Sequence, residues 1–134
     1  MPFVDNDHVS MVRQYCYVQR ENDRCHLPTS GVKPGETSKQ AVQRELQEEI
    51  GYVARRLDEV STYYTFKRVC DERAHLYRGY DLVRAALPPD ETESFECATL
   101  PFAAVLEQVL RSEIRDSIMV IAVLHAARQR GIPL

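Results

Sequence analysis

Three glutamates, Glu45, Glu48 and Glu49, lie close together in one short segment of the sequence. In a helix, residues three and four positions apart are neighbours, so the three carboxylates would gather on one face. Two like charges about 4 Å apart repel by roughly 4 kcal/mol at an effective dielectric of about 20. A hard divalent cation would remove this repulsion, and Mg²⁺ beside substrate phosphates is the usual solution. The alternative interpretation is a solvated acidic face that binds nothing.

The helix that carries these carboxylates is predicted over Thr37–Ile50. Thr37 and Gln40 have the spacing of a capping box, and Gly51 can adopt the left-handed conformation that ends a helix. The apolar stripe expected to face the core consists of Val42, Leu46 and Ile50. The side expected to face water consists of Gln40, Gln43 and Gln47. Arg44, four residues before Glu48, supplies a local cation for the cluster.

Further strands and helices are expected on both sides of this helix. Strands are predicted at His8–Val18, Leu57–Phe66, Ala74–Val83 and Phe95–Leu100, and helices at Phe102–Arg111 and Asp116–Arg130. Strands interleaved with helices indicate an α/β fold with a sheet covered on both faces. The length of 134 residues is enough for one domain with one core.

Composition narrows the classes of protein and partner. The net charge of −3 argues against nucleic acid, because phosphate backbones select basic surfaces. None of the four cysteines is in a C-x-x-C pair, which favours free thiols in a reducing, cytoplasmic compartment. The first residues do not resemble a signal peptide, and the apolar run Ile118–Leu124 is too short to cross a membrane. We therefore expect a cytoplasmic protein without nucleic-acid or membrane partners.

The acidic segment resembles the Nudix box, G-x5-E-x7-R-E-U-x-E-E-x-G-U, in which U is aliphatic. Glu36 is followed by seven residues and then by Arg44-Glu45-Leu46-x-Glu48-Glu49-x-Gly51, so every charged position matches. Two positions differ: Ser30 replaces the first glycine, with Gly31 one place later, and Tyr52 stands at the final aliphatic position.

Other segments resemble the ADP-ribose pyrophosphatase branch of the Nudix hydrolases. They are Val12-Arg13-Gln14-Tyr15, Leu27-Pro28, Pro34-Gly35-Glu36, Asp71-Glu72-x-x-His75 and Asp90-Glu91-Thr92-Glu93. The sequence differs from the branch at His26, where a glutamate is usual, and at Lys67 and Arg68, near the place of a usual proline. The resemblance implies a Nudix-type α/β/α sandwich with a mixed β-sheet. It also implies a single Nudix domain over residues 1–134, short at its N-terminus relative to that branch, and a homodimer.

The implied activity is Mg²⁺-dependent hydrolysis of a nucleoside diphosphate linked to another moiety, with Mn²⁺ as a second possible metal. The expected substrate is a small nucleotide-type molecule, first ADP-ribose and second a nucleotide sugar. The alternative is a non-catalytic Nudix protein that senses a nucleotide or binds a partner. The intact set of charged residues favours the enzyme, whereas the short front and Ser30 favour the alternative.

The resemblance assigns roles to individual residues. The expected metal ligands are Glu45 and Glu49, with Glu48 and Glu93 as additional ligands. The catalytic candidates are Glu91 as general base, with Glu72 next in line, Glu48, and Arg44, which would orient a carboxylate. The residues expected to support the site are Gly35, Glu36 and Gly51. Candidates for substrate contacts are Arg13, Lys67 and Arg68, although the pattern favours surface charges of a hairpin for the last two. His75 is expected to be structural.

Overall fold

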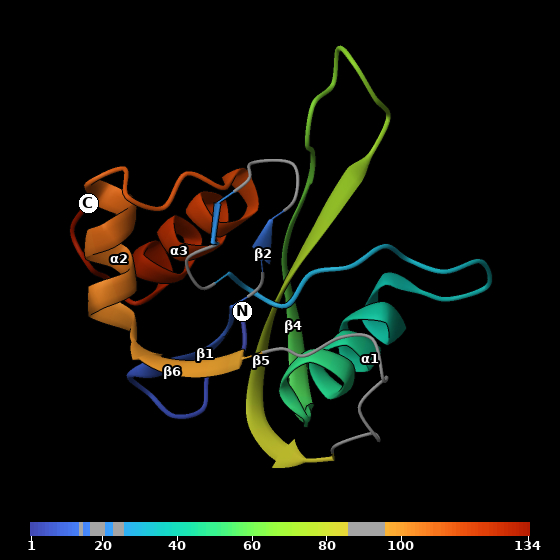
Figure 1. Cartoon of the computed structure of the whole chain (residues 1–134), viewed down its shortest axis with the longest axis horizontal. Helices are drawn as coiled ribbons and strands as arrows, with labels where there is room; N and C mark the ends of the chain where they lie inside the picture. The colour runs from blue at the N-terminus through green and yellow to red at the C-terminus, as the bar shows by residue number, and fades with distance from the viewer. Residues whose placement is uncertain (14, 17–20, 23–25, 86–95) are drawn as a thin grey trace.

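The computed structural model describes residues 1–13, 15–16, 21–22, 26–85 and 96–134 (Figure 1). Its elements in chain order are β1 (His8–Arg13), β2 (Tyr15–Cys16), β3 (Glu21–Asn22), α1 (Ser38–Ile50), β4 (Tyr52–Tyr64), β5 (Arg73–Arg84), β6 (Glu96–Pro101), α2 (Phe102–Leu110) and α3 (Ser117–Gln129). This order confirms the predicted alternation of strands and helices. No helix in the described ranges is long and apolar enough to cross a membrane.

The strands pair as β1 with β6, β2 with β3 and β4 with β5, and each pair is antiparallel. The N-terminal segment joins β1 to the β4–β5 hairpin, because Pro2 forms a parallel bridge with Gly79 and Phe3 an antiparallel bridge with Val9. A mixed sheet was expected. The described residues form antiparallel strand pairs and this one parallel bridge.

The helices cover the strands from two sides. Figure 1 shows α2 and α3 together on one side and α1 on the other. The core under α2 and α3 includes Val9, Met11, Val105, Met119 and Val123, and the core under α1 includes Val12, Leu46, Ile50, Ala54 and Leu57. Val9 and Met11 face the first core and Val12 faces the second, because successive side chains of a strand point to opposite faces. The expected α/β/α arrangement is confirmed.

Helix α1 begins and ends where its local sequence predicts. The Thr37 hydroxyl accepts from the Gln40 backbone N–H at 3.2 Å, and the Gln40 side chain accepts from the Thr37 N–H at 2.8 Å. Gly51 has φ of +73°, and its N–H donates to the carbonyl groups of Leu46 and Gln47. Both caps are local interactions, so the sequence contains all the information that they require.

The solvent-facing role expected for Gln43 and Gln47 is wrong. Gln43 donates to the Ala54 carbonyl at 2.6 Å and accepts from the Ala54 N–H at 3.0 Å, so its amide binds the start of β4. Gln47 donates to the Ala85 carbonyl at 3.2 Å. Both glutamines therefore tie α1 to the β4–β5 hairpin, and they are only half exposed.

The β4–β5 hairpin is longer than predicted. Strand β4 starts at Tyr52, directly after the Gly51 cap, and its pairing with β5 shifts between Glu59 and Ser61. The turn that joins the strands projects beyond the rest of the molecule (Figure 1). The hairpin matters for function because the face of β5 near this turn lies opposite α1.

Candidate functional site

Arg44 on α1 binds three carboxylates at once, and together they form a charged cluster that we call the Arg44 cluster. Its Nε and Nη2 donate to the two carboxylate oxygens of Glu36 at 3.0 and 3.1 Å. Its Nη1 donates to Glu48 Oε2 at 2.9 Å and also contacts Glu45 Oε1. Nη2 further donates to the Gly31 carbonyl at 3.2 Å. The rigid fork of a guanidinium suits this role, because it offers several donors in fixed directions.

Glu36 reaches Arg44 from a tight turn that precedes the helix. The Glu36 N–H donates to the Lys33 carbonyl at 3.0 Å, and Gly35 has φ of +81°, which only glycine adopts without strain. The Lys33 N–H in turn donates to Glu36 Oε2 at 3.0 Å. The hydrogen bonds from Arg44 and then from Lys33 lower the pKa of Glu36, and the same carboxylate raises the pKa of Arg44. The geometry agrees with the supporting roles expected for Gly35 and Glu36.

The three box carboxylates have different surroundings. Glu45 and Glu49, one turn apart, are buried, whereas Glu48 is exposed. Glu45 and Glu48 each bind Arg44 through a single oxygen. The positive charge of Arg44 compensates part of the repulsion within the cluster, and this compensation acts without any metal ion.

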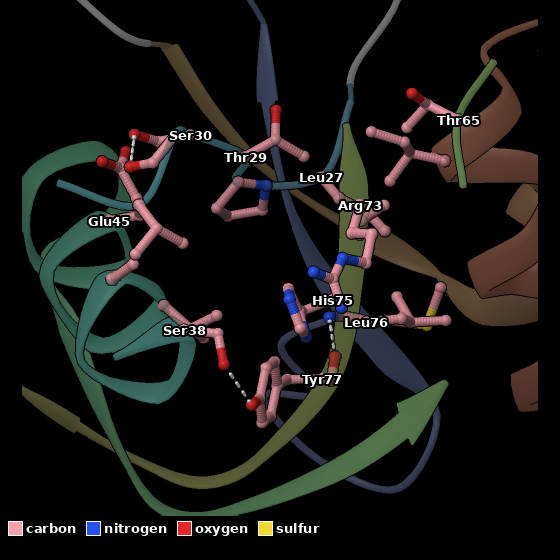
Figure 2. A pocket seen from close by; sticks show the side chains of 18 of the residues that line it. Leu27, Thr29, Ser30, Ser38, Glu45, Thr65, Arg73, His75, Leu76 and Tyr77 are labelled. Carbon is pink, nitrogen blue, oxygen red and sulfur yellow. Dashed lines mark hydrogen bonds between the residues drawn. The ribbon is translucent and has the colours of Figure 1, made fainter. Parts of the chain in front are cut away.

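A cavity of about 500 Å³ lies between α1 and β5 (Figure 2). Ser38 and Glu45 line it from α1, and Arg73, His75 and Tyr77 line it from β5. The cavity is also lined by apolar side chains, including Leu27, Val32, Leu46 and Ile118. A few converging polar groups on mostly apolar walls are typical of a site for a small molecule.

Gly31 connects the charged cluster to the cavity. Ser30 and Gly31 line the cavity, and the Gly31 carbonyl that binds Arg44 also accepts from the Ser30 hydroxyl at 3.2 Å. The late glycine of the motif is therefore held beside the box carboxylates despite its shift by one position.

Some predicted residues lie away from this cavity. Arg13, at the end of β1, pairs with Glu96 at 3.5 Å, and it is not among the cavity-lining residues. Lys67 and Arg68 lie exposed in the turn of the hairpin, which agrees with their alternative interpretation as surface charges. The substrate contacts expected of these three residues therefore stay predictions. Glu91 and Glu93 lie outside the described residues.

The sequence interpretation missed several cavity residues. Arg73, Ser38 and Tyr77 were not predicted, and His75 was expected to be structural. The available signal was the strand alternation of Arg73, His75 and Tyr77, which places their side chains on one face. Which face of the hairpin meets α1 is a property of the tertiary structure, so the strand pattern alone could not identify them as cavity residues.

The donor set fits Mg²⁺. Carboxylate oxygens are hard ligands, and this ion is commonly held by one or two protein carboxylates together with waters and substrate phosphates. Glu45 lines the cavity, and Glu49 follows it by one helical turn. The described residues contain no group of three or more acidic, histidine or cysteine side chains that could hold a metal alone. A site completed by the ligand is therefore the arrangement that these residues support.

The comparisons with known proteins agree with this geometry. The family model of the NUDIX domain matches residues 1–120. The chain is 29% identical to a methanol dehydrogenase activator of Bacillus methanolicus over 126 residues. These residues cover 92% of this chain and 68% of the relative. It is 27% identical to an ADP-ribose pyrophosphatase of Bacillus subtilis (strain 168) over 115 residues. These residues cover 84% of this chain and 62% of the relative.

The fold is also found among solved structures. The structure of an ADP compounds hydrolase matches with a TM-score of 0.84 and 22% identity, covering 97% of this chain and 71% of that chain. At this identity the match establishes the fold. The chain thus spans about two thirds of the length of the proteins that it resembles.

Proposed function

Because the chain belongs to the NUDIX domain family, we propose that it hydrolyses the diphosphate bond of a nucleoside diphosphate linked to another moiety. The preferred substrate candidate is ADP-ribose, and the alternative candidates are nucleotide sugars. We propose Mg²⁺ as the metal, with Mn²⁺ as the alternative because it also accepts oxygen ligands.

The observation that carries this proposal is the position of the Arg44 cluster at the cavity. Glu45 belongs to the cluster and lines the cavity, and Arg73 lines the same cavity from β5. A diphosphate bound between them would meet a metal held by carboxylates on one side and a guanidinium on the other. Arg73 forms no ion pair with any residue in the described ranges, so its donors are available to phosphate oxygens.

Each residue of the site has a proposed role. Glu45 and Glu49 hold the metal, and Glu48 and Glu93 complete its surroundings. When bound, Mg²⁺ supplies positive charge that stabilises the phosphate oxygens. Arg44 keeps the carboxylates oriented while Glu36 anchors Arg44. Glu91 takes the proton of the attacking water.

The similarity to an ADP-ribose pyrophosphatase supports the enzyme and its substrate class. The similarity to a methanol dehydrogenase activator favours a second candidate, a regulatory protein that binds a nucleotide or a partner. For either candidate we propose that residues 1–134 are a single domain that acts as a homodimer in the cytoplasm, without nucleic acid or membrane as a partner.

A substrate screen with Mg²⁺ tests the proposal. The purified chain is incubated with ADP-ribose, several nucleotide sugars and dinucleoside diphosphates. Added phosphatase then removes the phosphate of the monophosphate products, and this inorganic phosphate is measured. We expect turnover of ADP-ribose that disappears with a chelator and in the double variant Glu45→Gln/Glu49→Gln. Saturable binding of these compounds without turnover by the wild type would instead support the regulatory protein.

A further inference from the structure

A chain of hydrogen bonds starts at the cavity-lining residues Ser38 and Tyr77 and connects α1 to His75. The buried Tyr77 places its hydroxyl 2.8 Å from the Ser38 hydroxyl and donates to Glu59 Oε2 at 3.3 Å. Thr62 donates to the other oxygen of Glu59, Oε1, at 2.9 Å. Since each hydroxyl has a single proton, Tyr77 receives its second hydrogen bond from Ser38.

The contacts of the exposed Thr62 and His75 side chains favour one tautomer of the histidine ring. His75 Nδ1 lies 3.0 Å from Thr62 Oγ1 and 3.8 Å from Glu59 Oε1. An ionised carboxylate only accepts hydrogen bonds, so the Thr62 proton is directed to Glu59. Thr62 Oγ1 must then accept from His75, which places a proton on Nδ1. The neutral ring consequently has an unprotonated Nε2.

Nε2 is the group that His75 offers to a ligand. His75 lines the cavity, and its ring extends from β5 toward α1 (Figure 2). No described residue hydrogen-bonds to Nε2. A neutral acceptor repels phosphate oxygens, which are also acceptors, and it attracts a hydroxyl group.

Arg73 supplies the complementary group on the same wall. It precedes His75 by two residues, so both side chains are on one face of β5 and their Cα atoms are about 7 Å apart. If Arg73 binds the diphosphate, a sugar attached to that diphosphate can reach His75. The wall therefore offers a donor for phosphate and, next to it, an acceptor for a hydroxyl.

We propose that His75 is a specificity-determining residue whose Nε2 accepts a hydrogen bond from a hydroxyl of the moiety linked to the diphosphate. Thr62 is its positioning residue, because it orients the ring and fixes the proton on Nδ1. The inference rests on the diphosphate hydrolysis proposed above, and it assigns to His75 the recognition of the sugar hydroxyls beyond the diphosphate.

Two substrates that differ in hydroxyl groups test this inference. ADP-ribose is compared with the β-propyl ester of ADP, which keeps the diphosphate but has no hydroxyl beyond it. We expect His75→Phe to lower kcat/KM for ADP-ribose by roughly three- to tenfold, mainly through KM, the range for losing one neutral hydrogen bond. The value for the propyl ester should change by less than about twofold. His75→Asn, which can present an amide oxygen, should recover part of the loss.

A second measurement reports the ring itself. In ¹⁵N NMR spectra of the wild-type chain at about pH 8, His75 should carry its proton on Nδ1. Thr62→Val should move that proton toward Nε2 and lower kcat/KM for ADP-ribose but not for the ester. A proton on Nε2 in the wild type, or an equal loss for both substrates in His75→Phe, overturns the inference.

The same experiment distinguishes failure of this inference from failure of the proposed diphosphate hydrolysis. If the wild type hydrolyses neither these two compounds nor the nucleotide sugars of the screen, the proposed function fails and the inference fails with it. If the wild type hydrolyses both and His75→Phe does not alter the preference between them, the inference alone is wrong.

Discussion

Arg44 holds both carboxylate oxygens of Glu36, with Nε 3.0 Å from Oε1 and Nη2 3.1 Å from Oε2. The pair joins the turn before α1 to the middle of the helix, eight residues further along. Because the same guanidinium also reaches Glu45 and Glu48, the orientation of the box carboxylates depends on this pair.

Glu36→Gln should destabilise the chain in a pH-dependent way. The pKa of Glu36 is lowered from its ordinary value of 4.5, mainly by Arg44, so the folded state favours the ionised form. Its contribution to the free energy of unfolding is present above about pH 4.5 and is lost as the pH falls through the lowered pKa. Urea unfolding should therefore show a larger difference between wild type and variant at about pH 7 than at about pH 3.

The control for this prediction is Glu107→Gln on α2, whose carboxylate is exposed and pairs with Arg111. It should change the midpoint little at either pH, because exposed pairs contribute little. A Glu36→Gln difference of the same size at both pH values would falsify the ionic role of Glu36.

The sequence predicts interactions that are local along the chain. Thr37, Gln40 and Gly51 define the ends of α1 through contacts within a few residues, and the structure confirms them. The clustering of the box glutamates on one helix face follows equally from helical geometry. The fold and the family were predicted from the Nudix resemblance, because spacing alone supported only an α/β domain.

Interactions between distant residues were not predicted. Gln43 binds Ala54 from 11 residues away, and Tyr77 reaches Ser38 from 39 residues away. Helical periodicity identifies which side chains share a face, but it does not say whether water or another element covers that face. The cavity wall on β5 was missed for the same reason.

Glu49→Gln should remove most of the activity and leave the fold intact. Loss of a direct metal ligand should lower turnover at least about 10²-fold, more than losses typical of residues that only support ligands. Removing one negative charge also relieves repulsion, so thermal stability in metal-free buffer should be unchanged or slightly higher. The measurements are Mg²⁺-dependent rates and thermal unfolding with a chelator. Wild-type turnover by Glu49→Gln would show that Glu49 is not a ligand.

Arg73→Gln should weaken substrate binding more than Lys67→Gln. Arg73 lines the cavity, whereas Lys67 lies exposed in the hairpin turn. A charge-assisted hydrogen bond to phosphate contributes about 1.5–3 kcal/mol, so KM should rise roughly 10- to 100-fold for Arg73→Gln. Lys67→Gln should change KM less than about twofold. The reverse order would instead support the sequence-based prediction that Lys67 and Arg68 contact the phosphate.

Homodimer formation should depend on the tip of the hairpin rather than on α3. The apolar side chains of α3 are largely used inside the chain: Ala122 is buried, and Ile121 and Leu124 are partly buried and pack against the same core. In contrast, Phe66 and Val69 at the tip are 62% and 72% exposed. Phe66→Ser/Val69→Ser should convert a dimer into a monomer in light scattering, whereas Leu110→Ser on α2 should not. A wild-type mass near 15.4 kDa at micromolar concentration would refute the dimer.

The general base remains a prediction for the acidic segment Asp90-Glu91-Thr92-Glu93. Carboxylates that bind a metal ion are poor bases, because the charge of the ion lowers their pKa. A separate carboxylate is then needed, and Glu91→Gln should lower turnover by roughly 10²–10⁴-fold with little change in the affinity for substrate or Mg²⁺. Glu93→Gln should weaken Mg²⁺ binding as well as the rate.

These two variants distinguish three arrangements. If Glu91→Gln costs less than about threefold in turnover while Glu93→Gln costs about a hundredfold, the two roles are exchanged. If neither variant affects turnover, the base lies elsewhere, and Glu72 is the next candidate because it lines the cavity. Its Oε2 accepts from the Thr65 hydroxyl at 2.6 Å, which orients the carboxylate. In that case Glu72→Gln should show the loss in turnover expected here for Glu91→Gln, with the affinity for Mg²⁺ unchanged.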